Sequence, residues 1–397
     1  MEFGENNKIK LLIIVSTLGE SAFGRTTDRL ITELAKKCDL SLVVADDKNT
    51  QKFKSLGVST LVIKEKYSIN IKVSKLIMIL FAKEIKHFPW IIKNKNKVRQ
   101  FCKKQKPDII YAYCSLGDTF IAKIASLVAN DFNIKYAIHF CDPIPSPKGC
   151  ETYEKFRINR IKPLLKIFKD AAFLSFNNKK LIEHTQKYVP YKITHKSIVI
   201  PDSCISTLDN IPASPKEFIF SYIGQFYTLN RRPENLIKAF NTFIKNHPDC
   251  YLQLVGSGDI NLNIEGIDAL TKNHIKVIGW TKNVEEYLKN SNVLIDITLD
   301  IEEDLFISSK IKNYLTINRI ILSIAREQSA TRDFLKGVDE TIVKCNHDVD
   351  SIVKGMEECY NRFKNYIDLP YIEREKIISE CSVNNVAIRI IKTIKSI

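Results

Sequence analysis

Short hydrophobic runs alternate along the chain with longer stretches in which apolar residues recur at helical spacing. The runs are rich in Ile, Leu and Val, which is typical of strands buried on both faces, and the longer stretches are typical of amphipathic helices. This alternation predicts βαβ units around a parallel sheet that helices cover on both faces. The first series of predicted strands comprises residues 10–15, 40–45, 60–63, 109–112 and 135–140.

The same alternation restarts after residues 200–216, where three prolines and several Ser and Asp residues predict a connection between domains. The second series of predicted strands comprises residues 218–223, 251–255, 275–278, 293–297 and 320–324. A chain of 397 residues also exceeds the size at which one hydrophobic core usually stops growing. We therefore predict an α/β protein with two Rossmann-like, doubly wound parallel-sheet domains that face each other across a cleft. The expected parts are domains at 1–205 and 206–375 and a C-terminal helix at 376–397 that packs back on the first domain.

The formal net charge of +15 favours anionic partners, which include nucleic acid, anionic lipid headgroups and phosphate-bearing substrates. The apolar runs at 11–15 and 76–82 are too short for a signal-peptide core or a membrane span. Ten cysteines occur singly, without a Cys-x-x-Cys pair, which indicates reduced thiols and neither disulfides nor a zinc site. The expected location is the cytoplasm, and peripheral contact with the inner face of the membrane stays open.

The first strand of the second series runs into Gly224-Gln225, and a polar loop with Arg231 and Arg232 leads to a helix that starts near Pro233. Ligands of open parallel sheets bind beyond the carboxyl ends of the strands. Guanidinium groups at this place, beside a helix N-terminus, match the oxygens of a diphosphate. The alternative is that both arginines are solvated loop charges.

Two further motifs follow strands or start helices in this half. The Val255-Gly256-Ser257-Gly258 loop allows a sharp turn and a close approach of a ligand to the main chain. It lacks the third glycine of a dinucleotide fingerprint and the Lys of a P-loop, so neither NAD binding nor ATP hydrolysis is favoured. Ser308-Ser309-Lys310 predicts a serine-capped helix start whose free N–H groups and ammonium attract an anion, or else an ordinary surface helix.

The order of these motifs resembles the donor domain of the GT-B glycosyltransferases, in particular retaining family 4 and related bacterial polysaccharide and lipopolysaccharide enzymes. The segment from Arg232 to Phe240 is similar to the common Arg-Pro-x-x-Leu-Ile-x-Ala-Phe stretch, and Ser309 to Leu315 is similar to Ser-Lys-x-x-Glu-Tyr-Leu. Gln225 stands where many relatives have arginine, and Asn313 stands where the family has the glutamate that binds the donor ribose. An amide accepts a hydroxyl hydrogen bond without charge assistance, so the resemblance implies a weaker or rearranged ribose contact.

In the first half, the loop after the first strand contains Gly24 and Arg25, which by resemblance approach the donor phosphates and the acceptor. The alternative is a simple strand-to-helix turn. His139 and Asp142 lie where a buried strand ends, and His139 matches the family's strand-end histidine near the transferred sugar. The alternative for this histidine is a structural role.

The resemblance implies transfer of a sugar from a nucleotide-sugar donor of unknown base, with retention, to a glycan or lipid-linked acceptor in surface polysaccharide or lipopolysaccharide synthesis. It implies neither a metal nor a bound cofactor. The implied catalytic residues are His139, Asp142, Arg231 and Arg232. The implied donor-binding residues are Gly24, Gly224, Gln225, Gly256, Gly258, Ser308, Ser309, Lys310 and Asn313.

The lysine-rich segment 64–106 is interleaved with apolar and aromatic residues, so it predicts an amphipathic surface that rests on an anionic membrane. Its alternative is an apolar core face with solvated lysines. Three other functions stay open: a GT-B sugar-nucleotide 2-epimerase, a catalytically silent scaffold and a basic nucleic-acid-binding protein. Nucleic acid is not expected as a partner, because the basic residues do not form an RRM, KH, zinc-finger or helix-turn-helix pattern.

Overall fold

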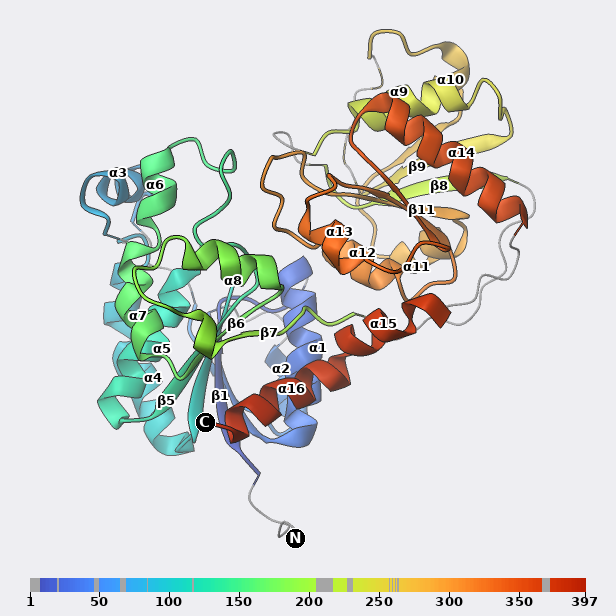
Figure 1. The fold of residues 1–397 in the computed structure, drawn as a ribbon. Coiled ribbons are helices and arrows are strands. Elements are labelled where there is room, and N and C mark those ends of the chain that lie inside the picture. The colour runs from blue at the N-terminus through green and yellow to red at the C-terminus, as the bar shows by residue number, and fades with distance from the viewer. Residues whose placement is uncertain are drawn as a thin grey trace. The chain divides into compact units, whose positions relative to one another are not determined.

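The computed structural model divides the chain into two compact units (Figure 1). The N-domain comprises Met1–Ser203 and Glu380–Ile397, and the C-domain comprises Cys204–Ser379, so the chain passes between the two domains twice. The structure describes residues 8–19, 21–45, 50–64, 69–83, 85–115, 118–204, 217–226, 231–256, 258, 260, 262, 264–365 and 372–397. Most of the predicted connection at 200–216 and the motif residue Ser257 lie outside the described residues.

The described part of the N-domain contains a seven-stranded parallel sheet in the order β3-β2-β1-β4-β5-β6-β7. Its strands are β1 (Lys10–Val15), β2 (Asp39–Val44), β3 (Ser59–Val62), β4 (Ile109–Cys114), β5 (Lys135–Phe140), β6 (Phe173–Phe176) and β7 (Ser197–Val199). Its helices are α1 (Ala22–Lys37), α2 (Thr50–Ser55), α3 (Ile71–Phe81), α4 (Phe88–Gln105), α5 (Thr119–Phe132), α6 (Glu154–Asn159), α7 (Leu165–Asp170), α8 (Lys179–Gln186) and α16 (Val383–Lys395).

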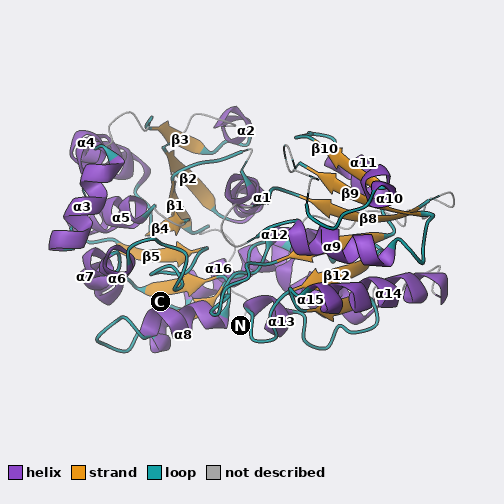
Figure 2. Ribbon diagram, turned by 90° about the horizontal axis from the view of Figure 1, so that it is seen from above, coloured by secondary structure: helices purple, strands orange, loops and turns teal. Residues whose placement is uncertain are grey.

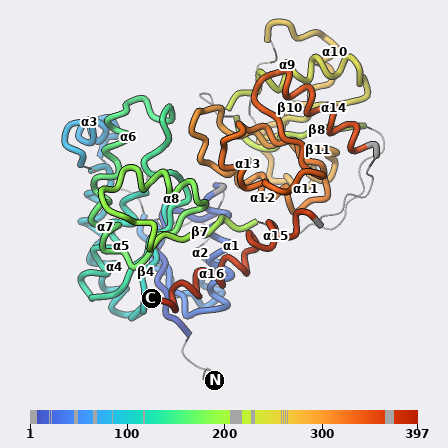
Figure 3. Tube along the Cα trace, viewed as in Figure 1, coloured from blue at the N-terminus to red at the C-terminus, as the bar shows by residue number. Residues whose placement is uncertain are grey.

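Helices cover both faces of this sheet, because its central strands are apolar on both sides (Figure 2). On one face, α4 and α5 pack over β1, β4 and β5. On the other face, α1 buries Leu30, Ile31 and Leu34, and α16 adds Ile390 and Ile394 to the same core. Figure 3 shows the red α16 beside the blue α1, so the C-terminal helix completes the core of the N-domain.

The described part of the C-domain contains a six-stranded parallel sheet in the order β10-β9-β8-β11-β12-β13. Its strands are β8 (Phe218–Ile223), β9 (Cys250–Val255), β10 (Ile275–Ile278), β11 (Val293–Ile297), β12 (Ile320–Ile324) and β13 (Ile342–Cys345). Its helices are α9 (Glu234–Phe243), α10 (Ala269–Asn273), α11 (Val284–Lys289), α12 (Ser309–Tyr314), α13 (Ala330–Phe334) and α14 (Val349–Asn365). The last helix, α15 (Glu375–Cys381), begins in the C-domain and ends in the N-domain.

One face of the C-domain sheet is covered by α9 and α14, which pack against each other. Leu236 and Phe240 of α9 and Met356 of α14 are fully buried in this core. Full burial of a side chain of this size stabilises the fold by roughly 1.5–3 kcal/mol relative to exposure. The first three strands, β8 to β10, are added toward one edge of the sheet, and the next three, β11 to β13, are added toward the other edge. In parallel sheets such a switch between β8 and β11 opens a crevice beyond the carboxyl ends of the strands.

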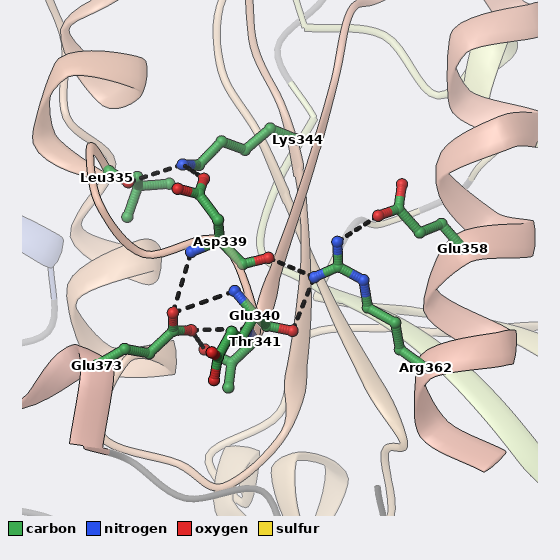
Figure 4. A network of polar contacts seen from close by, with 8 residues as sticks. All are labelled: Leu335, Asp339, Glu340, Thr341, Lys344, Glu358, Arg362 and Glu373. Atoms are coloured by element: carbon green, nitrogen blue, oxygen red, sulfur yellow. Dashed lines mark hydrogen bonds and ion pairs between the residues drawn. The ribbon is translucent and has the colours of Figure 1, made fainter. Parts of the chain in front are cut away.

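Polar contacts anchor the segment by which the chain leaves the C-domain (Figure 4). The carboxylate of Glu373 accepts the backbone N–H groups of Asp339, Glu340 and Thr341 at 3.0, 3.1 and 2.7 Å. The next residue, Arg374, is 1% exposed. Its guanidinium donates to Thr341 Oγ1 at 2.7 Å and to the carbonyls of Tyr314, Ile317, Arg319 and Thr341 at 3.5, 3.0, 2.7 and 3.0 Å. These contacts tie the exit segment to the turn before β13 and to the end of α12.

Candidate functional site

A cavity of about 370 Å³ opens at the carboxyl edge of the C-domain sheet. Ile297 ends β11, Ile324 ends β12, and His347 follows β13, so three neighbouring strands lead into the same space. The start of α9 forms another wall. This is the position at which open parallel sheets bind their ligands. The lining residues are Arg231, Arg232, Glu234, Asn235, Leu236, Ile297, Asp300, Ile324, His347 and Ile352.

Two guanidinium groups meet at this cavity beside the first turn of α9. Arg231 is half-buried and Arg232 is exposed, and both line the space. The N-cap residue of α9 is Pro233, and its side chain makes no capping hydrogen bond. The N–H groups of a first turn have no partner within the helix, so the wall combines backbone donors with two fixed positive charges. A phosphate or diphosphate matches these donors, while the carboxylates of Glu234 and Asp300 line the same cavity.

Lys310 of α12 passes close to the end of β8. Gly224 has a φ of +149°, and a Cβ atom at this position would lie 3.1 Å from Lys310 Cδ. The Lys310 ammonium lies 3.4 Å from Tyr222 Oη and 5.0 Å from the centroid of the Tyr222 ring. The positive φ therefore favours glycine here, and a larger residue would also crowd the lysine side chain. The structure brings together two predicted donor-binding residues, Gly224 and Lys310.

The electrostatics near Lys310 suit an anionic ligand. Burial of its ammonium lowers the pKa of Lys310 to about 7, and the positive charge of Arg231 lowers this pKa further. Burial also raises the pKa of Asp304 to about 6. A desolvated ammonium beside another cation gains more from a bound anion than a solvated lysine does, because water no longer screens the interaction.

Comparison with known proteins rests on structure, since no family model matches the chain and no curated protein matches its sequence. HepE from Anabaena, in complex with UDP and glucose, aligns over 98% of this chain and 100% of its own, with a TM-score of 0.65 and 12% identity. The lipopolysaccharide outer core galactosyltransferase WaaB aligns over 98% and 99%, with a TM-score of 0.64 and 14% identity. The chain has the GT-B fold. This confirms the predicted fold class, and identities this low show the fold alone.

A third structural neighbour is described as a member of a different enzyme class. A putative UDP-N-acetylglucosamine 2-epimerase from Listeria monocytogenes aligns over 98% of this chain and 96% of its own, with a TM-score of 0.51 and 13% identity. The GT-B fold therefore does not by itself separate the two enzyme classes.

The start of α12 has the predicted serine cap, but two of the N–H groups that were expected to be free are satisfied by that cap. Ser308 is the N-cap residue, and its Oγ accepts the N–H groups of Lys310 and Ile311 at 3.1 and 3.3 Å. Ser308 Oγ also donates to the buried Asp296 at 2.7 Å. These two N–H groups are thus already satisfied, so an anion at this helix start would interact mainly with the Lys310 side chain. The prediction overlooked that a capping serine competes with a ligand for the same donors.

The other predicted donor residues of the C-domain occupy several environments. Gly256 has a φ of +78°, and a Cβ atom there would lie 3.9 Å from the backbone of Gly224, so the loops after β8 and β9 adjoin. Gly258 also has a positive φ and meets no atom within 4 Å. Gln225 is exposed, and Asn313 is half-buried on α12. None of these four residues lines the described cavity beside α9.

In the N-domain, Gly24 lies in the first turn of α1 and not in the loop before it, which corrects the prediction. Ser21 caps this helix by accepting the N–H of Gly24 at 2.9 Å. A Cβ atom on Gly24 would lie 2.8 Å from Gly19 N and from Leu18 C, so the helix packs directly on the backbone of the preceding loop. Arg25 is exposed.

Because no atom fits between α1 and this loop, we expect Gly24→Ala to destabilise the N-domain by about 1–3 kcal/mol. The matched control is Gly279→Ala, since a Cβ atom on Gly279 meets no atom within 4 Å. Urea unfolding followed by circular dichroism measures both changes. Equal stability of the two variants would contradict the tight contact.

His139 is the next-to-last residue of β5, at the predicted strand end, and is 0% exposed. Its Nδ1 pairs with Ser175 Oγ at 3.1 Å, and its ring stacks on Tyr113 with centroids 4.3 Å apart. Asp142 follows the strand and is half-buried. Within the N-domain these contacts give His139 a packed, hydrogen-bonded position at the end of the sheet.

Among the described residues, His139, Cys141 and Asp202 form a group whose potential ligand atoms lie within 4.8 Å of one another. Burial raises the pKa of the Cys141 thiol well above its usual range, and the charge of Asp202 raises it further. Without a bound ion, burial keeps Cys141 in its neutral thiol form, whereas a metal would bind the thiolate. Asn177 instead donates to Asp202 Oδ2 and to the Cys141 carbonyl, both at 2.8 Å.

Several cavity residues escaped the sequence prediction. His347 follows β13, a strand too short and too mixed to be predicted, and Asp300 lies in the loop after β11. Burial lowers the pKa of His347, while the carboxylate of Asp300 opposes that shift. If β13 had been predicted, His347 would have been expected at the carboxyl edge of the sheet, where ligands bind. The apolar residues of this strand were the signal in the sequence.

Proposed function

We propose that this protein is a glycosyltransferase whose C-domain holds the diphosphate of a nucleotide-sugar donor. The observation that carries the proposal is the cavity at the carboxyl edge of the sheet, which Arg231 and Arg232 line beside the start of α9. Lys310 does not line this cavity, but it lies beside Gly224 and its charge interacts with that of Arg231. The complex of HepE with UDP and glucose, a protein of the same fold, supports a nucleotide-sugar ligand.

In the proposed reaction the nucleoside diphosphate leaves the sugar as an anion. The arginines and Lys310 stabilise the charge that develops on this leaving group, which is commonly the largest electrostatic contribution to catalysis. Stereochemical retention follows if the leaving phosphate accepts the proton of the acceptor hydroxyl on the same face of the sugar. The proposed acceptor is a glycan or a lipid-linked glycan of surface polysaccharide or lipopolysaccharide synthesis, and the proposed reaction uses no metal.

A thermal-shift screen against UDP, GDP, CMP and their sugars tests the donor proposal. The matching nucleotide is expected to raise Tm, because a ligand that binds only the folded state stabilises it. Loss of one charge-assisted contact in Arg232→Ala should weaken that nucleotide about tenfold. Lys238→Ala is the matched control, since Lys238 is exposed on the same helix and does not line the cavity. The absence of any nucleotide shift, or equal affinities of the two variants, would overturn the proposal.

The second candidate is a GT-B sugar-nucleotide 2-epimerase, which the similarity to the Listeria protein favours. Such an enzyme would convert the donor without an acceptor. Product analysis by NMR of a nucleotide sugar incubated with the protein alone distinguishes the two. An epimerised sugar supports the epimerase, whereas turnover that requires an added glycan acceptor supports the transferase.

A further inference from the structure

Exposed apolar side chains gather on one short stretch of the N-domain. Among the described residues, thirteen large apolar side chains are exposed, and seven of them lie within residues 71–92. Each of the seven is 46–65% exposed. Single exposed apolar residues are normal, but a concentration of this kind marks an interaction surface. The seven are Ile71, Val73, Leu76, Leu80, Phe81, Phe88 and Ile92.

Most of these residues belong to α3, a helix that is apolar around most of its circumference. The side chains of α3 that are buried are those of Ser74 and Met78. The helix is nevertheless held firmly, because the buried Asn159 of α6 donates to the carbonyls of Met78 and Ile79 at 2.9 and 3.3 Å. Figure 1 shows α3 beside α6 at the margin of the N-domain. The contact with α6 thus holds α3 in place while most of its apolar side chains face solvent.

The charge of this stretch is strongly positive. Residues 71–93 contain five lysines and one glutamate. A lysine can lay its apolar stem along a hydrophobic surface while its ammonium reaches the phosphates of a bilayer. Apolar residues flanked by lysines therefore match a membrane interface that carries anionic lipids. Among the described residues, no helix has the length and hydropathy needed to cross a membrane.

A cavity of about 270 Å³ lies beneath α3 at the edge of this surface. Three cations line it, Lys75, Lys86 and Arg160, together with one acid, Glu151. Arg160 Nη1 contacts Glu151 Oε1 at 3.2 Å, so the two lysines carry the net positive charge of the cavity. Lys75 Nζ lies 5.4 Å from the ring centroid of Phe156, which forms an apolar wall. The cavity thus combines cations with apolar walls, as a phospholipid headgroup and its glycerol region require.

We propose that α3 and the start of α4 form a membrane-docking surface. The exposed apolar side chains enter the interface of an anionic bilayer, and the cavity beneath α3 receives the phosphate of a lipid headgroup. The convex, nearly all-round apolar surface of α3 favours a bilayer over a protein partner, whose binding needs a complementary groove or face. This inference does not depend on the proposed transferase activity.

Flotation with vesicles tests the docking surface on the full chain. The wild type is expected to float with phosphatidylcholine vesicles that contain phosphatidylglycerol, to float poorly with phosphatidylcholine alone, and to be released by salt. The triple variant Leu76→Ser/Leu80→Ser/Phe81→Ser should bind the anionic vesicles at least about tenfold more weakly. Lys75→Gln/Lys86→Gln should lose the preference for anionic vesicles.

The control variant is Leu270→Ser/Trp280→Ser, because both side chains are exposed in the C-domain, 40% and 66%. It should float like the wild type, and all variants should unfold at the wild-type temperature. Equal flotation of the triple variant, or no flotation of the wild type, overturns the proposal. A wild-type dimer that the triple substitution dissociates, without vesicle binding, would instead assign the surface to self-association. The nucleotide-induced shift in Tm should be the same in the triple variant, so the two proposals fail independently.

Discussion

Replacing Lys310 with methionine is expected to weaken nucleotide diphosphate binding about 100-fold, because a desolvated charge-assisted contact lies at the upper end of the range for such bonds. Methionine keeps the length and the apolar packing of the side chain beside Gly224 and Tyr222, and removes only the charge. The expected loss is larger than that for the exposed Arg232, since water screens an exposed guanidinium. Isothermal titration with the nucleotide identified in the screen measures the change.

The charge of Lys310 should also make nucleotide binding depend on pH. Lys310 is charged below its pKa of about 7, and a bound diphosphate favours the charged form and raises this pKa. Affinity should therefore be highest below pH 7 and should fall as the pH rises through 7. Ionisation of Asp304 above its pKa of about 6 acts in the same direction, because it adds a negative charge nearby.

Lys310→Arg provides the matched control for both effects. Arginine remains charged throughout this pH range, so the variant should retain most of the affinity and should lose the fall near pH 7. Wild-type affinity in Lys310→Met would exclude Lys310 from the donor site. A flat wild-type profile across this range would show that the ammonium does not change its charge there.

Arg374→Met is expected to lower the free energy of unfolding of the C-domain by about 3–5 kcal/mol, because it removes a buried charged donor from several partners. Arg374 is 1% exposed and donates to Thr341 Oγ1 and to four backbone carbonyls. The residues that carry these carbonyls are at most 3% exposed, so solvent does not readily replace the lost donors. Guanidinium chloride unfolding followed by circular dichroism measures the change.

Arg362→Met is the matched control in the same network (Figure 4). Arg362 pairs with Glu358 on α14 and donates to the carbonyls of Asp339 and Glu340. Its side chain is 26% exposed, so solvent can replace these partners and its loss should cost about 1 kcal/mol or less. A difference of less than about 1 kcal/mol between the two variants would contradict the anchoring role of Arg374.

The fold was predictable because its signals are local. A strand buried on both faces of a parallel sheet must be apolar along its length, and each predicted strand is present, for example β1 and β8. The missed strands, β6, β7 and β13, have three or four residues each, and periodicity alone does not separate so short an apolar run from a helix segment. Two equally short strands, β3 and β10, were predicted. Gly224 and the two arginines were predictable for a similar reason, since a strand, a glycine turn and a helix start follow one another directly.

Burial and long-range contact are what the sequence could not show. The sequence alone determined a two-domain α/β protein with a phosphate-type motif after the first strand of the second sheet. Only the tertiary structure decided that Lys310 lies against Tyr222, 88 positions away, and that His139 is fully buried. It also decided that the hydroxyl of the predicted cap residue satisfies two N–H groups of α12. The physical reason is that hydrophobic periodicity records only which face of a helix or strand is buried. The pKa of a side chain, the partner of an N–H group and the exposure of an apolar helix depend on which other elements pack around that residue.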